Sequence, residues 1–170
     1  MRTSPLLADF IHARVCKLIC AKLLTLPFHM LLYRAFHAQR NYLRPCFGRI
    51  GLGAGQPKML VYLDSHGPCR QKELADYFEV DPAAVSRMMD TLERGGFVVR
   101  RRDESSRRCD LTELTEKGRE AVRAWTGFCS QEEEQMLRDF TPEERQQFAD
   151  FLVRAYRNLR EGKEGEPWES

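Results

Sequence analysis

The sequence predicts a mainly helical chain with one small β-hairpin, an α+β fold in which long helices flank a compact central lobe. Three observations predict it. Apolar residues recur at helical spacing on both sides of the centre, and a short helix stands next to a sharply capped one between residues 71 and 95. Two short β-prone runs then follow, joined by an arginine-rich tip. With 170 residues, the chain is long enough for one domain with its own core.

The first 26 residues carry a near-continuous apolar stripe with helical spacing, which favours an amphipathic helix. Charged residues interrupt the stripe, so neither a membrane span nor a secretory signal is expected. Two interpretations stay open for this segment: an added dimerisation helix, or a start codon assigned too far upstream. Without a signal for export, we expect a cytoplasmic protein that does not associate with a membrane.

Residues 27–45 form the next expected helix, with Pro45 as its end because proline disfavours a helical residue before it. Its apolar stripe is Leu31, Leu32, Ala35, Phe36 and Leu43. A second helix is expected over residues 56–65, followed by a break at His66, Gly67 and Pro68. A third, short helix is expected from Gln71 onward.

The segment 82–94 predicts a sharply defined helix. Asp81 is a good N-cap, Pro82 occupies the first helical position, and Val80 and Val85 can form a hydrophobic staple. One face is expected to be buried, and its residues are Val85, Met88, Met89 and Leu92. The opposite face carries Ala83, Arg87, Asp90 and Arg94, with Ser86 at its edge. Gly95 is expected to supply the left-handed C-terminal cap.

Two strand-like runs, Phe97–Arg100 and Cys109–Leu114, predict a hairpin with a polar tip. Five arginines concentrate positive charge there: Arg100, Arg101, Arg102, Arg107 and Arg108. Taken alone, the charged face of the 82–94 helix or the basic hairpin is commonly just a solvated charged surface. A basic hairpin directly after a capped pair of helices is a winged helix-turn-helix, which can touch DNA at two places.

These residues resemble the DNA-binding lobe of MarR-type transcriptional regulators. The resemblance rests on VSRMMDTLE, then GF, the arginine hairpin and the LTEKG segment at Leu114–Gly118, and it extends from an entry at Gly53–Gln56. It implies a homodimeric repressor or activator whose DNA affinity is tuned by a small ligand, an oxidant or a metal. Arg87 matches a recognition-helix arginine and Arg108 a wing arginine. The family usually has Asp where this chain has Ser106, which puts the detailed geometry of the wing in doubt.

The expected organisation is an extension over residues 1–26, a MarR-type domain over 27–162 and a disordered tail over 163–170. Within the domain, the winged lobe covers 54–114, and helices over 27–45 and 115–162 dimerise. Thr141-Pro142-Glu143-Glu144 is a capping box that opens a C-terminal helix ending before Gly162. Its apolar residues are Phe148, Phe151, Leu152, Ala155, Tyr156 and Leu159. Such stripes are best covered by a second copy of the chain.

Charge is distributed unevenly along the chain, although the formal net charge is only +2. Residues 1–130 carry 21 Lys and Arg against 14 Asp and Glu, a balance of +7. Residues 131–170 carry 6 against 11, a balance of −5. The basic charge therefore lies in the part that holds the winged lobe, and the acidic charge in the C-terminal helices.

The expected function is a sequence-specific, homodimeric repressor that binds a pseudo-palindromic operator of double-stranded DNA. The residues expected to contact DNA are Gln71, Pro82, Ala83, Ser86, Arg87, Arg94, Arg101, Arg102, Arg107 and Arg108. A small aromatic or anionic compound is the expected effector, in a crevice where the flanking helices meet the lobe. The lining residues named for it are Tyr33, His37, Arg40 and Trp125, and the alternative is that they simply fill an interface.

Two further interpretations stay open. Cys69 lies beside Arg70 at the start of a helix, where a lowered pKa would suit a thiol-based redox sensor of the same fold. The lobe could also be a protein-interaction module that uses the winged helix without DNA, a reading opposed by its exposed arginines. The six cysteines form no CxxC and no ligand set, so no metal or cofactor is expected. Enzyme motifs such as HExxH and GxSxG are absent from the sequence, so no catalytic residue is expected.

Overall fold

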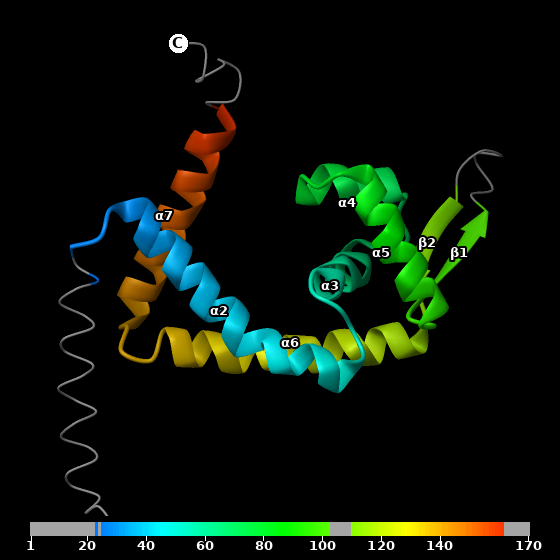
Figure 1. Cartoon of the computed structure of the whole chain (residues 1–170), viewed down its shortest axis with the longest axis horizontal. Coiled ribbons are helices and arrows are strands. Elements are labelled where there is room, and N and C mark those ends of the chain that lie inside the picture. The colour runs from blue at the N-terminus through cyan, green and yellow to red at the C-terminus, as the bar shows by residue number, and fades with distance from the viewer. Residues whose placement is uncertain (1–22, 24, 103–109, 162–170) are drawn as a thin grey trace, which may run out of the picture. The chain divides into compact units, whose positions relative to one another are not determined.

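The structure, a computed structural model, describes residues 23, 25–102 and 110–161. Its elements are α2 (Phe28–Ile50), α3 (Gln56–His66), α4 (Gln71–Phe78), α5 (Pro82–Arg94), β1 (Val98–Arg102), β2 (Asp110–Leu114), α6 (Glu116–Met136) and α7 (Pro142–Glu161) (Figure 1). The predictions for residues 1–22, for the tip of the hairpin at 103–109 and for the tail at 162–170 lie outside the described residues. The fold class expected from the sequence is confirmed.

Two compact units make up the chain, with the division after Trp125. The first unit holds α2 to α5, the hairpin and the first turns of α6. Its core is one cluster of buried apolar side chains: Leu52, Met59, Leu60, Leu63, Cys69, Leu74, Ala75, Val85, Met89, Leu92, Phe97, Val98, Leu114, Ala121 and Val122. Because these residues come from each element between α3 and α6, the core fixes α5 and the hairpin in one lobe.

The two strands pair antiparallel, with Val98 opposite Leu114 and Arg102 opposite Asp110. A third segment pairs with β2 through a single residue, Cys69. Cys69 and Thr112 exchange two backbone hydrogen bonds, at 3.2 and 2.8 Å, and so place the start of α4 against the edge of the hairpin. This bridge could not be predicted from the sequence, because a single extended residue between Pro68 and a helix has no periodicity.

The helix ends differ from the expectations at two places. The prediction that Pro45 ends α2 is wrong, since the helix runs on to Ile50 and stops at Gly51, which has a φ of 68°. Proline removes one helical hydrogen bond. The turn beyond it is held by tertiary contacts, with the Phe47 ring stacked on Trp125 at 5.3 Å and Ile50 packed on the core.

The left-handed residue after α5 is Gly96, with a φ of 74°, and not Gly95, whose backbone is right-handed. The helix therefore keeps one more helical residue before it turns. Gly95 still donates its N–H to the Thr91 carbonyl oxygen at 3.0 Å, and Phe97 donates to the Leu92 oxygen at 2.9 Å. These two hydrogen bonds close the end of α5, and the chain continues directly into β1.

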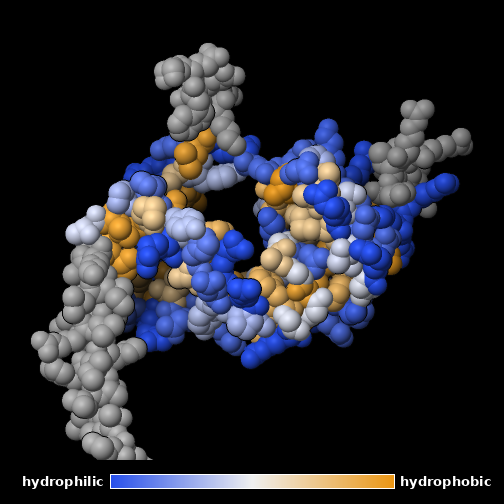
Figure 2. All heavy atoms as spheres, viewed as in Figure 1, coloured by the Kyte–Doolittle hydropathy of each residue, from blue (hydrophilic) through white to orange (hydrophobic). Residues whose placement is uncertain are grey.

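In the second unit, the capping box at the start of α7 is confirmed. The Glu144 carboxylate accepts from the Thr141 N–H at 2.8 Å, and the Thr141 hydroxyl accepts from the Glu144 N–H at 3.2 Å. No residue of α7 is buried. Its large apolar side chains are open to solvent, from Phe148 with 38% exposed to Leu159 with 72%. Figure 2 shows that apolar atoms also reach the surface elsewhere on the molecule.

Candidate nucleic-acid interface

The α5 helix separates a buried face from an exposed one, as the sequence predicts. The Asp81 carboxylate caps it by accepting from the Ala84 N–H at 3.0 Å. Val85 and Met89 are fully buried, with Leu92 beside them at 1% exposure. Pro82, Ala83, Arg87, Asp90 and Arg94 are exposed, and Ser86 is half-buried. The lobe therefore holds α5 by one side and leaves the other open.

The two arginines of this face differ in how firmly they are held. Arg87 lies 3.9 Å from Asp81, with 72% of its side chain exposed, which is a weak surface ion pair that a better acceptor can replace. Arg94 folds back on the helix, where its guanidinium donates to the Asp90 carbonyl oxygen and to the Thr91 hydroxyl, both at 3.3 Å. Arg87 is therefore the more available of the two.

The hairpin presents two further arginines in its described part. Arg101 pairs with Glu113 across the strands at 3.0 Å and keeps 69% of its side chain exposed. Arg102 is exposed near the tip. Arg107, Arg108 and Ser106 lie outside the described residues.

The sequence predicts Arg100 to be one of the basic residues of the wing, but its contacts in the structure are different. Its guanidinium binds Asp90 at 2.5 Å and Glu93 at 2.9 Å, both on α5, and only 26% of its side chain is exposed. With its amide oxygen turned toward the guanidinium, Gln71 at the start of α4 accepts from Arg100 at 3.0 and 3.1 Å. These four residues, the Arg100 cluster, join β1 to α5 and α4. The only signal in the sequence was Asp90 and Glu93, three residues apart on one helix.

The start of α6 is bound to the end of α5 through residues 115–118, the last four of the LTEKG motif. The Thr115 hydroxyl donates to the Gly96 carbonyl oxygen at 2.7 Å and accepts from the Gly118 N–H at 3.1 Å. The Lys117 ammonium donates to the Gly95 oxygen at 2.7 Å and lies 4.4 Å from the centre of the Phe97 ring. This 115–118 contact holds the end of α5, a role that could not be predicted from the sequence.

The residues named for an effector are only partly brought together. Tyr33 and His37 touch, with ring centres 4.3 Å apart, and Arg40 lies 5.8 Å from the Phe36 ring one turn away on α2. Trp125 is stacked on Phe47 instead. Since Phe47 is ten residues beyond His37, the two sites are about 15 Å apart along the helix. Within one chain, Trp125 therefore does not share a crevice with the other three residues.

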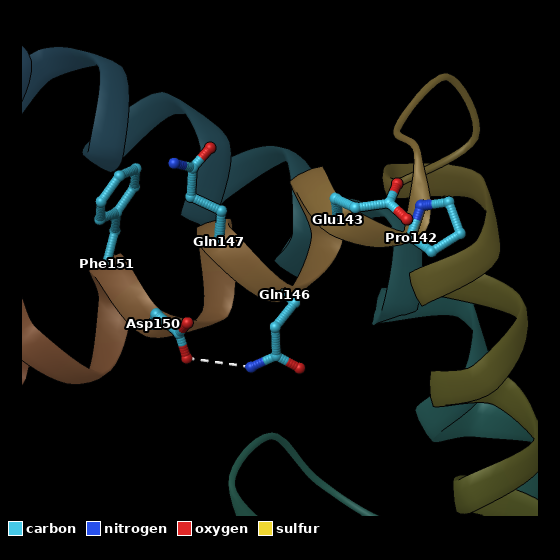
Figure 3. A pocket seen from close by; sticks show the side chains of 6 residues that line it. All are labelled: Pro142, Glu143, Gln146, Gln147, Asp150 and Phe151. Atoms are coloured by element: carbon cyan, nitrogen blue, oxygen red, sulfur yellow. Dashed lines mark hydrogen bonds between the residues drawn. The ribbon is translucent and has the colours of Figure 1, made fainter.

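Depressions are found on the second unit, along α7. One of about 640 Å³ is lined by Pro142, Glu143, Gln146, Gln147, Asp150 and Phe151 (Figure 3). The Gln146 amide donates to the Asp150 carboxylate at 2.9 Å along its rim. A smaller one of about 290 Å³ shares Gln147 and Phe151. Both are shallow and open, so they describe an uncovered helix face rather than an enclosed ligand site.

Cys69 does not have the lowered pKa expected of a redox sensor. The side chain is buried, with 4% exposed. Burial raises the pKa of the Cys69 thiol from 9.0 to about 11, and the Glu73 carboxylate acts in the same direction. Because the thiolate is the reactive form, this thiol is poorly suited to sensing oxidants. The sequence suggests a lowered pKa because Arg70 is the next residue. The burial that raises the pKa depends on tertiary packing, which the sequence does not show.

The described ranges contain no group of three or more His, Cys, Asp or Glu residues placed to hold a metal ion. Nor does any helix in those ranges have the length and apolar character needed to cross a membrane.

Residues 53–109, from the turn before α3 to the hairpin, match the model of the MarR family. YxaD of Bacillus subtilis, an uncharacterized HTH-type transcriptional regulator, is 33% identical over 96 residues, which make up 56% of this chain and 67% of YxaD. The chain belongs to the MarR family. It is an HTH-type transcriptional regulator and not an enzyme.

Solved MarR-family structures have the same fold. MarR itself is 28% identical, with a TM-score of 0.71 over 83% of this chain and 97% of MarR. A putative MarR-family regulator of Listeria monocytogenes, solved in complex with 26-mer DNA, gives a TM-score of 0.76 over 86% of this chain and 100% of its own. At 20% identity, the latter likeness concerns the fold alone.

Proposed function

We propose that this MarR-family regulator is a homodimeric repressor that binds a pseudo-palindromic operator. The recognition helix α5 enters the major groove, with Arg87, Ala83 and Ser86 nearest the bases, and Pro82 and Arg94 at its ends. The hairpin arginines Arg101, Arg102, Arg107 and Arg108 approach the adjacent minor groove or its phosphates. In this proposal Gln71 holds the Arg100 guanidinium and does not contact DNA directly.

One observation carries this proposal: α5 is buried on one face and open on the other, with a weakly held arginine at the centre of the open face. Its first residues are small, which allows the helix backbone to come close to base edges. The Listeria monocytogenes protein has the same fold and was crystallised with DNA, which supports the same use here.

The dimer is supported by α7. The α7 helix has 20 residues and none of them is buried, although it carries a stripe of large apolar side chains. Such a stripe is unfavourable in water and needs a partner surface that covers it. A second copy can cover this stripe, and a twofold axis would place two α5 helices about one DNA turn apart. A small aromatic or anionic effector, bound near Tyr33, His37 and Arg40, would release the operator. Trp125 could join that site only from the partner protomer.

Selection of bound duplexes from a random DNA library tests the proposal. The expected product is an inverted repeat whose half-sites are centred about 10 base pairs apart, bound by a dimer of chains. The mass of the free protein, from light scattering, should correspond to two chains at micromolar concentration. A monomer that selects a single unrepeated site would overturn the homodimer model, and recovery of no common sequence would overturn specific binding.

A further inference from the structure

Asp90 and Glu93 place two negative charges on the helix that is to approach DNA. Within α5 they balance Arg87 and Arg94, so the helix has no net positive charge of its own. Carboxylates this close to phosphates repel them, since the separation is within the Debye length. A recognition helix with two unpaired acids on it would therefore weaken its own binding.

Arg100 neutralises these acids. Its Nη2 binds Asp90 at 2.5 Å and its Nη1 binds Glu93 at 2.9 Å, while Nε and Nη2 face the Gln71 amide oxygen. All three guanidinium nitrogens are thereby engaged. Arginine suits this arrangement because its planar fork spreads donors over three separate nitrogens, whereas lysine carries its three N–H donors on a single nitrogen.

The same contacts fix the wing against the recognition helix. Arg100 lies on β1, two residues before the end of the described strand, and its partners lie on α5 and α4. The side chains of Arg100 and Glu93 are partly buried, with 26% and 37% exposed, whereas Asp90 keeps 50% exposed. Water therefore screens the pair with Glu93 less than a surface pair. A change at Arg100 would therefore alter both the charge of α5 and the angle of the hairpin.

We propose that Arg100 is a positioning residue for operator binding, which masks the Asp90 and Glu93 carboxylates and locks the hairpin to α5 without contacting DNA. This inference rests on the proposed function. It reassigns an arginine of the wing from the DNA surface to the contact between β1, α5 and α4, and it assigns Gln71 to the same cluster.

A cycle of variants in the full-length protein tests it. The proteins are the wild type, Arg100→Gln, the pair Asp90→Asn with Glu93→Gln, and the triple variant, each titrated with the selected operator by fluorescence anisotropy at several salt concentrations. Arg100→Gln should weaken binding about tenfold when the acids are present and less than about threefold when they are neutralised. Arg100→Lys should keep only part of the affinity, because its single ammonium nitrogen lacks the planar fork that reaches Asp90, Glu93 and Gln71 together.

A phosphate contact predicts a different result. Arg100→Gln would then weaken binding equally in both backgrounds and reduce the slope of log K against log salt by about 0.9, and this outcome would overturn the proposal. Amide hydrogen exchange of the DNA-free proteins gives a second readout. Exchange should quicken in β1 and β2 of Arg100→Gln while α6 stays unchanged, and equal protection in the hairpin would also overturn it.

The two proposals can fail separately. If the wild type binds no operator, the proposed function fails, but hydrogen exchange still tests the lock between hairpin and α5. Should Arg100→Gln not fold, the Gln71→Ala variant removes one acceptor while both ion pairs remain. It is expected to quicken exchange in the hairpin and to weaken binding less than threefold, and unchanged exchange would count against the cluster.

Discussion

The carbonyl oxygen of Phe97 occupies the place where a side chain on Gly118 would begin. A β-carbon at Gly118 would lie 2.2 Å from that oxygen and 3.0 Å from the Leu114 side chain. Glycine thus lets the first turn of α6 pack directly on the chain that leaves α5. It completes the 115–118 contact, in which Thr115 and Lys117 bind Gly96 and Gly95.

Gly118→Ala should therefore destabilise the lobe by about 2–3 kcal/mol, because the backbone oxygen cannot move aside as a flexible side chain could. Urea denaturation followed by circular dichroism measures this. Gly127→Ala is the matched control, since it lies in the same helix with nothing within 4 Å of the added carbon. The control should be neutral or more stable by about 0.5–1 kcal/mol, and similar losses in both variants would contradict the close approach at Phe97.

Arg87→Ala should cost about 1–3 kcal/mol in operator binding and less on random DNA. The reason is that Arg87 is held only by a 3.9 Å pair with Asp81 and can turn toward a base edge. Parallel titrations with the operator and a scrambled duplex check it. Equal losses on both duplexes would show a phosphate contact instead of base reading.

Arg102→Ala should reduce the slope of log K against log salt by about 0.9, the value for one lost phosphate contact. Arg101→Ala should change the slope less, since Arg101 is already paired with Glu113 at 3.0 Å. Both variants keep the strands intact, because the side chains are exposed. An unchanged slope in Arg102→Ala would remove this part of the hairpin from the DNA surface.

Local signals in the sequence predicted local structure well. Asp81 and Pro82 located the start of α5, and Thr141 with Glu144 located the start of α7, because caps depend on neighbours within one turn. The continuation of α2 past Pro45 depends on Phe47 meeting Trp125, about 80 residues away in the sequence. Arg100 likewise appeared to be one more wing charge, since its pairing with Asp90 and Glu93 exists only after the lobe has folded.

The pH dependence of stability offers a test of the Cys69 environment. The pKa of its thiol is raised from 9.0 to about 11 in the folded chain, so folding favours the protonated form. Its contribution is fully present below pH 9 and is lost as the pH rises toward 11, by up to about 2–3 kcal/mol. Comparison with Cys69→Ala isolates this group from other titrations. The difference in the free energy of unfolding between the two proteins should shrink over that range, and a constant difference would show that the thiol is hydrated.

The exposed stripe of α7 gives the last prediction. Leu152, with 44% of its side chain exposed, lies between Phe148 and Tyr156 on the face proposed to meet a second copy. Leu152→Asp should shift the dimer toward monomer at micromolar concentration, because burying an unpaired carboxylate costs several kcal/mol. Because Leu152 is exposed and not part of the buried core, the substitution should change the helical signal of the protein little. Arg157 lies on the opposite face of the same helix from the stripe. Arg157→Asp makes a larger change of charge there and should leave the dimer intact. Sedimentation velocity distinguishes the cases: a dimeric Leu152→Asp protein would show that the apolar face of α7 is not the interface.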